Sequence, residues 1–191
     1  MKKGKFIIIS APSGAGKSTV ISLVKGHIPN YHFSRSCTTR QPRGEEMHGR
    51  EYFFITEAEF QKRIDNDEFV ESEKVYNKGW YGSLKSETIE MAEKGNNVMF
   101  DVDVKGGMSL KKIYGKNAVS IFIMPPSIEE LERRLLKRNT DKPEKIRERV
   151  DKAKSEIEYA NNFDHVVLND DLDKCVKETI DIINDFLGQK E

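Results

Sequence analysis

The sequence predicts an α/β fold in which a parallel β-sheet is flanked by helices. Short apolar runs rich in β-branched residues predict buried strands at 6–9, 98–103 and 118–124. Segments of helical composition separate and follow these runs, and such alternation of strand and helix is typical of a parallel sheet. The chain has 191 residues, which is enough for one hydrophobic core with a small insertion.

Composition limits the classes of function. Lys+Arg and Asp+Glu are each 32, so the formal net charge is zero, which argues against a general nucleic-acid binder. Cys37 and Cys175 give no disulfide framework and suit a reducing compartment. No apolar run approaches the length of a membrane span, and the segment before residue 10 lacks a signal-peptide core. We therefore expect a cytoplasmic protein without nucleic-acid or membrane partners, of unknown oligomeric state.

The strand at 6–9 is followed by a glycine-rich loop that ends in Gly16-Lys17-Ser18 and continues as a helix. This order is the signature of a phosphate-binding P-loop. Glycines allow backbone angles that direct successive N–H groups into one concavity at the positive end of the helix. Lys17 is expected to contact the β- and γ-phosphates, and the Ser18 hydroxyl to ligate Mg²⁺. The predicted triphosphate site comprises Ala11, Pro12, Ser13, Gly14, Ala15, Gly16, Lys17, Ser18 and Thr19.

One position departs from the P-loop pattern, because Ala11 stands where the pattern has glycine. We expect this alanine to be tolerated with ordinary backbone angles. The alternative for the whole stretch is a glycine-rich turn before an ordinary helix. The helix itself is predicted from Ser18 to Lys25, with Val20, Ile21 and Val24 in the core and Gly26 and Pro29 ending it.

An arginine-rich segment at 33–46 is the second candidate for an anion site. Arg35, Arg40 and Arg43 lie among serines and threonines, and Pro42 restrains the chain between the last two. The planar guanidinium suits a bidentate contact with phosphate, and the hydroxyls add donors. Taken alone, such a loop is usually just a solvated surface.

The middle of the chain predicts further strands and helices. Thr56-x-x-Glu59 has the form of a capping box that opens a helix through about residue 66, and 69–73 alternates like a half-exposed strand. A helix is predicted from 83 to 94, and a turn at Gly106-Gly107. Alternation along the strand at 98–103 would place Asp101 and Asp103 on one side, near the ligand crevice of a parallel sheet.

The C-terminal half predicts two arginine-bearing helices and a final strand and helix. Ser127-x-x-Glu130 caps the first helix after the strand at 118–124, and a second follows Pro143. Their charges fit either a solvated face or a mobile lid that brings arginines to a phosphoryl group. After a strand at 166–168, Asn169 is a possible cap for the last helix, 172–187.

Several of these segments together resemble the guanylate kinase family. The resemblance begins with Ser36-Cys37-Thr38-Thr39-Arg40-x-Pro42-Arg43-x-x-Glu46 and Gly49-x-x-Tyr52. It continues over nearly the whole chain, in the family's order, through Glu68-Phe69-Val70-Glu71, Tyr81-Gly82-Ser83, Asp101-Val102-Asp103, Pro125-Pro126-Ser127 and Asn169-Asp170-Asp171-Leu172-Asp173.

This resemblance implies a P-loop kinase fold with a small mixed β lobe for GMP at about 34–83 and a helical lid at about 127–149. The core would comprise 1–33, 84–126 and 150–191. The resemblance also implies ATP as phosphoryl donor, with Asn169 near the adenine, and GMP or dGMP as acceptor. The implied GMP site is Ser36, Arg40, Arg43, Glu46, Tyr52, Glu71, Tyr81, Gly82, Ser83, Asp101 and Asp103. The implied catalytic residues are Lys17, Arg43, Arg134, Arg138 and Arg149.

The expected reaction is therefore direct transfer of the γ-phosphoryl group from ATP to GMP. Two alternatives remain open. One is a kinase for another nucleoside monophosphate on the same scaffold, and the other is a non-enzymatic module of this family that binds phosphopeptides. The presence of Lys17, Ser18 and the arginines argues against the module.

Overall fold

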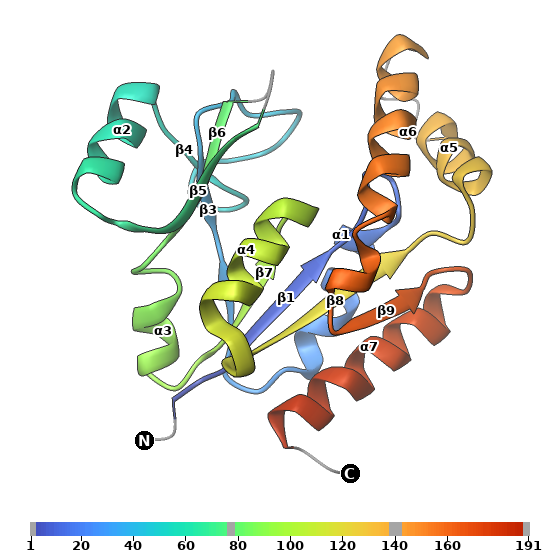
Figure 1. Cartoon of the computed structure of the whole chain (residues 1–191). Helices are drawn as coiled ribbons and strands as arrows, with labels where there is room; N and C mark the ends of the chain where they lie inside the picture. The colour runs from blue at the N-terminus through green and yellow to red at the C-terminus, as the bar shows by residue number, and fades with distance from the viewer. Residues whose placement is uncertain (1–2, 76–78, 138–142, 189–191) are drawn as a thin grey trace. The chain divides into compact units, whose positions relative to one another are not determined.

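A computed structural model of the chain describes residues 3–75, 79–137 and 143–188. Its larger sheet has five strands in the order β2-β7-β1-β8-β9 (Figure 1). Both β2 with β7 and β8 with β9 pair in parallel, as the sequence predicts. The strands are β1 (Phe6–Ser10), β2 (Tyr31–Ser34), β7 (Asn97–Asp101), β8 (Ala118–Met124) and β9 (His165–Leu168).

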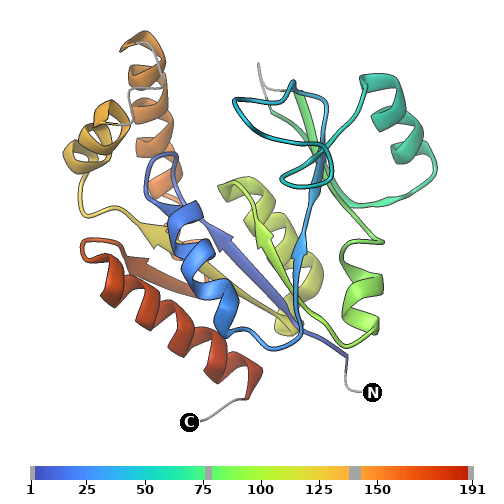
Figure 2. The same cartoon turned by 180° about the vertical axis from the view of Figure 1, so that it is seen from behind.

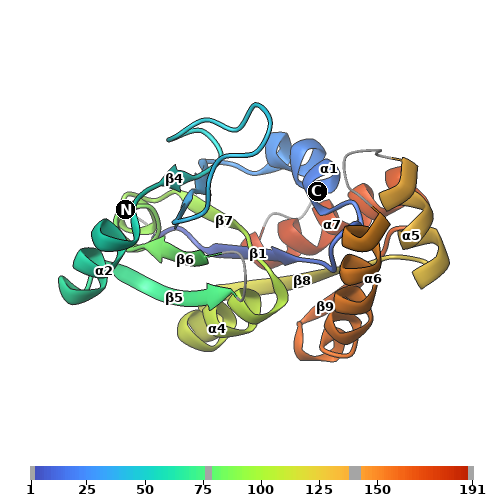
Figure 3. The ribbon, with the colours of Figure 1, turned by 90° about the horizontal axis from the view of Figure 1, so that it is seen from above.

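By its internal contacts the chain divides into two compact units. The first unit comprises Met1–Phe6 and Asn30–Phe100, and the second comprises Ile7–Pro29 and Asp101–Glu191. Helices of the second unit are α1 (Lys17–Val24), α4 (Val104–Tyr114), α5 (Ile128–Lys137), α6 (Pro143–Ile157) and α7 (Leu172–Leu187), with short 3₁₀ turns at Lys25–His27, Gly115–Asn117 and Ala160–Asn162. Figure 2 shows α1 and α7 side by side on one face of β8 and β9, and Figure 3 shows α4 on the opposite face.

The core of the second unit follows the predicted pattern. All residues of β1 are buried, and so are those of β8 apart from Met124, which is half-buried. The predicted inner face of α1, formed by Val20, Ile21 and Val24, is buried as expected. Strands buried on both faces need apolar residues throughout, which is why these runs do not alternate with polar residues.

The turn predicted at Gly106-Gly107 is wrong, because both glycines are buried inside α4. A β-carbon at residue 107 would lie 3.0 Å from the Phe163 ring. Close packing of α4 against Phe163 therefore favours glycine here, although glycine costs about 1 kcal/mol of helix propensity. The helix begins at an N-cap, Asp103, whose Oδ1 accepts a hydrogen bond from the Gly106 N–H at 2.9 Å. Since β7 ends at Asp101, the alternation that was expected to place Asp101 beside Asp103 does not extend to Asp103.

Helices α5 and α6 pack against each other through an apolar cluster of their own. Leu131 and Leu135 of α5 contact Ile146, Val150 and Ala153 of α6. Ser127 accepts a hydrogen bond from the Glu130 N–H, as the predicted cap requires. The two arginine-bearing helices therefore bury an apolar face between them.

The first unit contains a four-stranded mixed sheet in the order β4-β3-β6-β5. Its strands are β3 (Ser36–Thr38), β4 (Phe53–Phe54), β5 (Phe69–Val75) and β6 (Gly79–Leu84). Helix α2 (Glu57–Asp65) covers this sheet, and its predicted cap is confirmed because Thr56 accepts from the Glu59 N–H. Cys37, Phe60, Phe69 and Leu84 form the core between them.

The helix predicted from 83 to 94 is only partly present. Ser83 and Leu84 belong to β6, where Ser83 pairs with both β3 and β5, and only α3 (Ile89–Glu93) is helical. Cross-strand pairing thus overrides the helical composition of this segment.

Candidate functional site

The P-loop of the second unit has the backbone geometry that the sequence predicts. Gly14 and Gly16 have φ angles of +98° and +97°, and Gly16 is the N-cap of α1. In this conformation the free N–H groups of the first helical turn face the loop, where they attract an anion. Ser18 and Thr19 follow in that first turn and are exposed, so their hydroxyls are available to a ligand.

Lys17 lies over the end of β7. Its Nζ forms an ion pair with Asp101 and donates a hydrogen bond to the Val102 carbonyl at 3.0 Å. Both partners lie in the second unit, as does Lys17. These two contacts hold the ammonium group at the loop, and Lys17 is not part of the hydrophobic core. A lysine with three rotatable donors can exchange such partners for phosphate oxygens.

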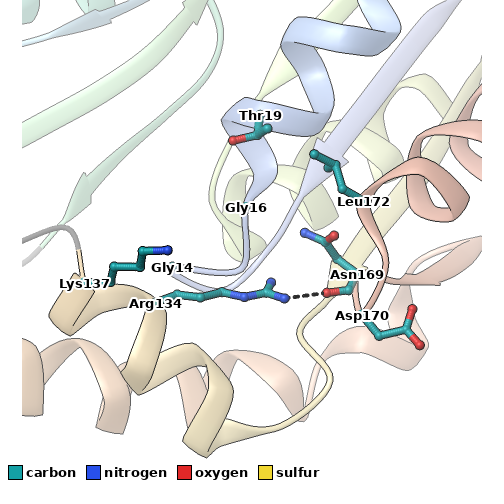
Figure 4. Close-up of a pocket in the computed structure, with 8 residues that line it drawn as sticks. All are labelled: Gly14, Gly16, Thr19, Arg134, Lys137, Asn169, Asp170 and Leu172. Atoms are coloured by element: carbon teal, nitrogen blue, oxygen red, sulfur yellow. Dashed lines mark hydrogen bonds between the residues drawn. The ribbon is translucent and has the colours of Figure 1, made fainter.

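A pocket of about 450 Å³ adjoins the P-loop (Figure 4). It is lined by Gly14, Gly16, Thr19, Arg134, Lys137, Asn169, Asp170 and Leu172. The backbone of β9 leads directly to Asn169, and Asp171, not Asn169, caps α7 by accepting from the Lys174 N–H. The possibility that Asn169 caps this helix is therefore wrong.

Asn169 instead holds the loop. Its buried side chain donates from Nδ2 to the Ala15 carbonyl at 2.7 Å. A β-carbon on Gly16 would approach the same Nδ2 to 2.6 Å, so a larger residue there would displace Asn169 and would also be strained at a φ angle of +97°. Arg134 donates from Nη2 to the Asn169 carbonyl at 2.9 Å, and Glu130 orients it by accepting from Nε. Bonds from Arg133 and Arg134 lower the pKa of Glu130 to about 2, so Glu130 is ionised at neutral pH.

Ala11 fits its place without strain. Among the described residues other than glycine, only Asn30 and Asp67 have positive φ angles, so the angles of Ala11 are ordinary, as expected. We predict that Ala11→Gly changes the dissociation constant for ATP by less than about threefold, because glycine here adds only unfolded-state entropy. Calorimetric titration with ATP measures this constant. A larger change would show that the methyl group shapes the loop.

In the first unit, one face of the four-stranded sheet carries a row of polar side chains. Ser36 of β3 lies opposite Ser83 of β6, and Ser83 lies opposite Glu71 of β5. Residues directly opposite on neighbouring strands point to the same face, so we call these three the polar row. Ser83 is fully buried and donates to Glu71 Oε1 at 2.8 Å. Glu71 is therefore half-buried and hydrogen-bonded, and does not simply face water.

Beside the polar row lies a group of polar and aromatic side chains built on Arg40. Its Nη1 and Nη2 donate to the two carboxylate oxygens of Glu46 at 2.6 and 2.8 Å, and Nε donates to Tyr81 Oη at 3.0 Å. The guanidinium carbon lies 5.0 Å from the centroid of the Tyr52 ring. The bond from Arg40 holds the pKa of Glu46 below its usual value. We call Arg40, Glu46, Tyr52 and Tyr81 the Arg40 cluster.

Comparison with known proteins assigns the family. The guanylate kinase family model matches residues 3–186. The chain belongs to the guanylate kinase family. Curated guanylate kinases of Bacteroides thetaiotaomicron and Porphyromonas gingivalis are 52% and 54% identical to it, over 98% and 97% of this chain and 92% and 99% of theirs. A crystal structure of guanylate kinase from Anaplasma phagocytophilum matches with a TM-score of 0.77 at 27% identity, over 100% of this chain and 89% of that chain.

The structure brings most of the residues implied by the guanylate kinase pattern into two groups. The P-loop, Asp101, Arg134 and Asn169 lie together in the second unit, and the polar row and the Arg40 cluster lie together in the first. Arg43 is exposed, and its backbone N–H donates to Glu46. Gly82 lies on the opposite face from the polar row, against the Phe69 ring. Arg149 is half-buried on α6, and Arg138 lies outside the described residues.

Sequence reasoning missed some residues that contact this machinery. Glu130 was considered only as part of a cap and of a solvated face, although its carboxylate also orients Arg134. Glu156 of α6 is buried and accepts from the Ser13 N–H of the loop at 3.4 Å. Lys137 and Leu172 line the pocket. Only Glu130 has a local signal, its spacing of four residues from Arg134 on one helix face.

Proposed function

We propose that this protein transfers the γ-phosphoryl group of ATP to GMP and releases ADP and GDP. The observation that carries this conclusion is the identity of more than 50% with curated guanylate kinases over nearly the whole chain. The two groups of side chains support it, because the reaction needs one site for a triphosphate and another for a purine monophosphate. We expect dGMP to be accepted as well, as the resemblance to the family implies.

ATP is expected to bind the P-loop with its phosphates and the adjoining pocket with its nucleoside. Lys17 would exchange Asp101 and the Val102 carbonyl for the β- and γ-phosphates. The exposed Ser18 hydroxyl fits Mg²⁺, a hard cation that usually takes few protein oxygens and completes its shell with phosphates and water. When bound, Mg²⁺ would neutralise charge on the phosphates.

GMP is expected to bind the first unit through both of its ends. Glu71 presents carboxylate acceptors to the N1–H and 2-amino donors of guanine, and Ser36 can donate to O6. The guanidinium groups of Arg40 and Arg43 would donate to the 5′-phosphate, with Arg43 supplying positive charge that no described ion pair neutralises. Glu46 fixes the guanidinium of Arg40 by a two-point contact, so little side-chain entropy remains to be lost on binding.

Phosphoryl transfer of this kind needs positioning and charge stabilisation more than covalent chemistry. Lys17 and the arginines of α5 and α6 would stabilise the charge that develops on the transferring group. Arg134 is already oriented by Glu130 beside the loop. Exclusion of water by a closed lid would prevent hydrolysis of ATP. Asp101 and Asp103 remain candidates for contact with the acceptor.

A coupled assay for ADP release separates the possible functions. The wild-type protein is supplied with ATP and Mg²⁺ and with GMP, dGMP, AMP, UMP or CMP in turn. Strong preference for the guanine nucleotides supports the proposal. Preference for another monophosphate would assign a different kinase activity, and no ADP release with any acceptor would favour the non-enzymatic module.

The lid gives a prediction about dynamics. We expect a bisubstrate analogue to slow amide hydrogen exchange in α5 and α6, because their arginines would gain phosphate partners. Their shared cluster around Leu131 and Ile146 should move as one body. Helix α4 serves as the internal control, since its exchange should change little. Unchanged exchange at 128–137 and 143–157 would remove the lid from the mechanism.

We place this reaction in the cytoplasm, where GMP and ATP are available and thiols stay reduced. Both cysteines are free and buried, and burial raises the pKa of Cys37 to about 12, so neither is a ready nucleophile. Over the described residues, no helix is long and apolar enough to cross a membrane.

A further inference from the structure

Arg35 makes an ion pair that the proposed reaction does not use. It lies between β2 and β3, directly before Ser36 of the polar row. Its Nε and Nη2 donate to the two carboxylate oxygens of Glu87 at 2.9 and 3.1 Å. Glu87 is only 9% exposed, so the carboxylate of the pair is largely screened from solvent. Two parallel bonds of this kind hold a guanidinium in one orientation.

The third nitrogen of the same guanidinium reaches the loop between β3 and β4, residues 39–52. Arg35 Nη1 donates to the Gly49 carbonyl at 2.9 Å. Gly49 has a φ angle of +81°, and its own N–H donates to the Tyr52 carbonyl at 2.8 Å. The guanidinium carbon also lies 5.2 Å from the centroid of the Phe53 ring. The loop is thereby fixed to Arg35 at a point between Glu46 and Tyr52.

We propose that this clamp, formed by Arg35, Glu87 and the Gly49 carbonyl, is a positioning device that sets the Arg40 cluster at the correct distance from the polar row. Arg35 adjoins the row at Ser36, and Glu87 lies in the turn after β6, the strand that carries Ser83. Gly49 lies on the loop that carries the cluster. One side chain thus joins both halves of the acceptor site.

The inference rests on the proposed function, because it requires that GMP is bound by these two groups. Within GMP, the distance between the base and the 5′-phosphate can vary only over a limited range. A loop held at the correct place before binding avoids the entropy cost of ordering it, whereas a loose loop would weaken phosphate contact. The clamp should therefore control the KM for GMP and leave ATP binding unaffected.

The competing explanation is that the pair only stabilises the fold, since breaking a buried ion pair destabilises proteins in general. Arg63 provides a matched control in the same unit. It donates to Glu59 at 3.1 Å and to Glu68 at 3.0 Å, and its side chain is 30% exposed, compared with 33% for Arg35. Neither Glu59 nor Glu68 lies on the loop between β3 and β4.

The experiment compares steady-state kinetics and melting temperature for Arg35→Ala, Arg35→Lys, Glu87→Gln and Arg63→Ala. We expect Arg35→Ala to raise the KM for GMP at least about tenfold, with the KM for ATP unchanged within about twofold. Arg35→Lys should raise the KM for GMP as well, because an ammonium cannot hold three acceptors in one plane. Glu87→Gln should raise the KM for GMP by a smaller factor, at least about threefold. Arg63→Ala should lower the melting temperature without this selective change.

The outcomes separate the two proposals. If the wild-type protein does not phosphorylate GMP, the proposed function fails. If it does, and Arg35→Ala matches Arg63→Ala in its KM for GMP, the clamp alone is overturned. Should Arg35→Ala fail to fold, Glu87→Gln decides, because it keeps the size of the buried side chain. A wild-type KM for GMP in that variant would also overturn the clamp.

Discussion

Replacing Lys17 by alanine is expected to lower kcat by at least about 10³-fold while the fold survives. The ammonium group would stabilise charge on the β- and γ-phosphates, and no neighbouring described side chain offers an equivalent cation from the loop. The fold should survive because Lys17 lies over the end of β7 and not in the core. Kinetics with GMP and ATP, together with a circular-dichroism melt, measure both effects.

Lys111 supplies the control for loss of a lysine ion pair. Its Nζ contacts Asp164 and the Ala118 carbonyl, each at 2.7 Å, and its side chain is 26% exposed, compared with 20% for Lys17. Lys111→Ala should therefore cost similar stability and leave kcat unchanged. If Lys17→Ala retains activity within about tenfold, equivalent to about 1.4 kcal/mol of barrier, Lys17 does not have the proposed role.

Changing Glu71 to glutamine is expected to lower kcat/KM for GMP by about 100-fold or more and to narrow the preference for GMP over AMP. A carboxylate offers two acceptors to the two donors of guanine, whereas the amide places its own donor against one of them. Ser83 can still donate to the remaining carbonyl oxygen, so the sheet should stay intact. Kinetics with both nucleotides, and the affinity for ATP, measure the effect.

Glu73 is the matched control, because it lies two residues further along β5 and so on the same face. Glu73→Gln should leave base preference unchanged. Wild-type kinetics and preference in Glu71→Gln would contradict the assignment and leave base recognition unexplained. A loss of ATP affinity in the same variant would instead indicate a general disturbance of the protein.

The strands and helices that could be predicted were those with a strong local signal. In each case a few consecutive residues are enough to predict the local structure. This holds for the apolar runs of β1 and β8, the caps at Thr56 and Ser127, and the P-loop glycines. Helix α4 could not be predicted, because Gly106-Gly107 favours a turn and the contact with Phe163 that favours glycine at 107 is visible only in the tertiary structure. Ser83 and Leu84 were predicted to be helical because their strand pairing is also a tertiary contact. Only pairing with β3 and β5 makes this segment a strand.

The sequence by itself determined the chemistry of this protein, in the order and spacing of the P-loop and of the family segments around Arg40, Glu71 and Arg134. Tertiary structure decided which partners those groups have. Asp101 pairs with Lys17, Asn169 supports the Ala15 carbonyl, and Glu87 holds Arg35, although each pair is separated by 52 residues or more. Local periodicity carries no information about contacts at such separations, because they form only when the sheets bring distant strand ends together.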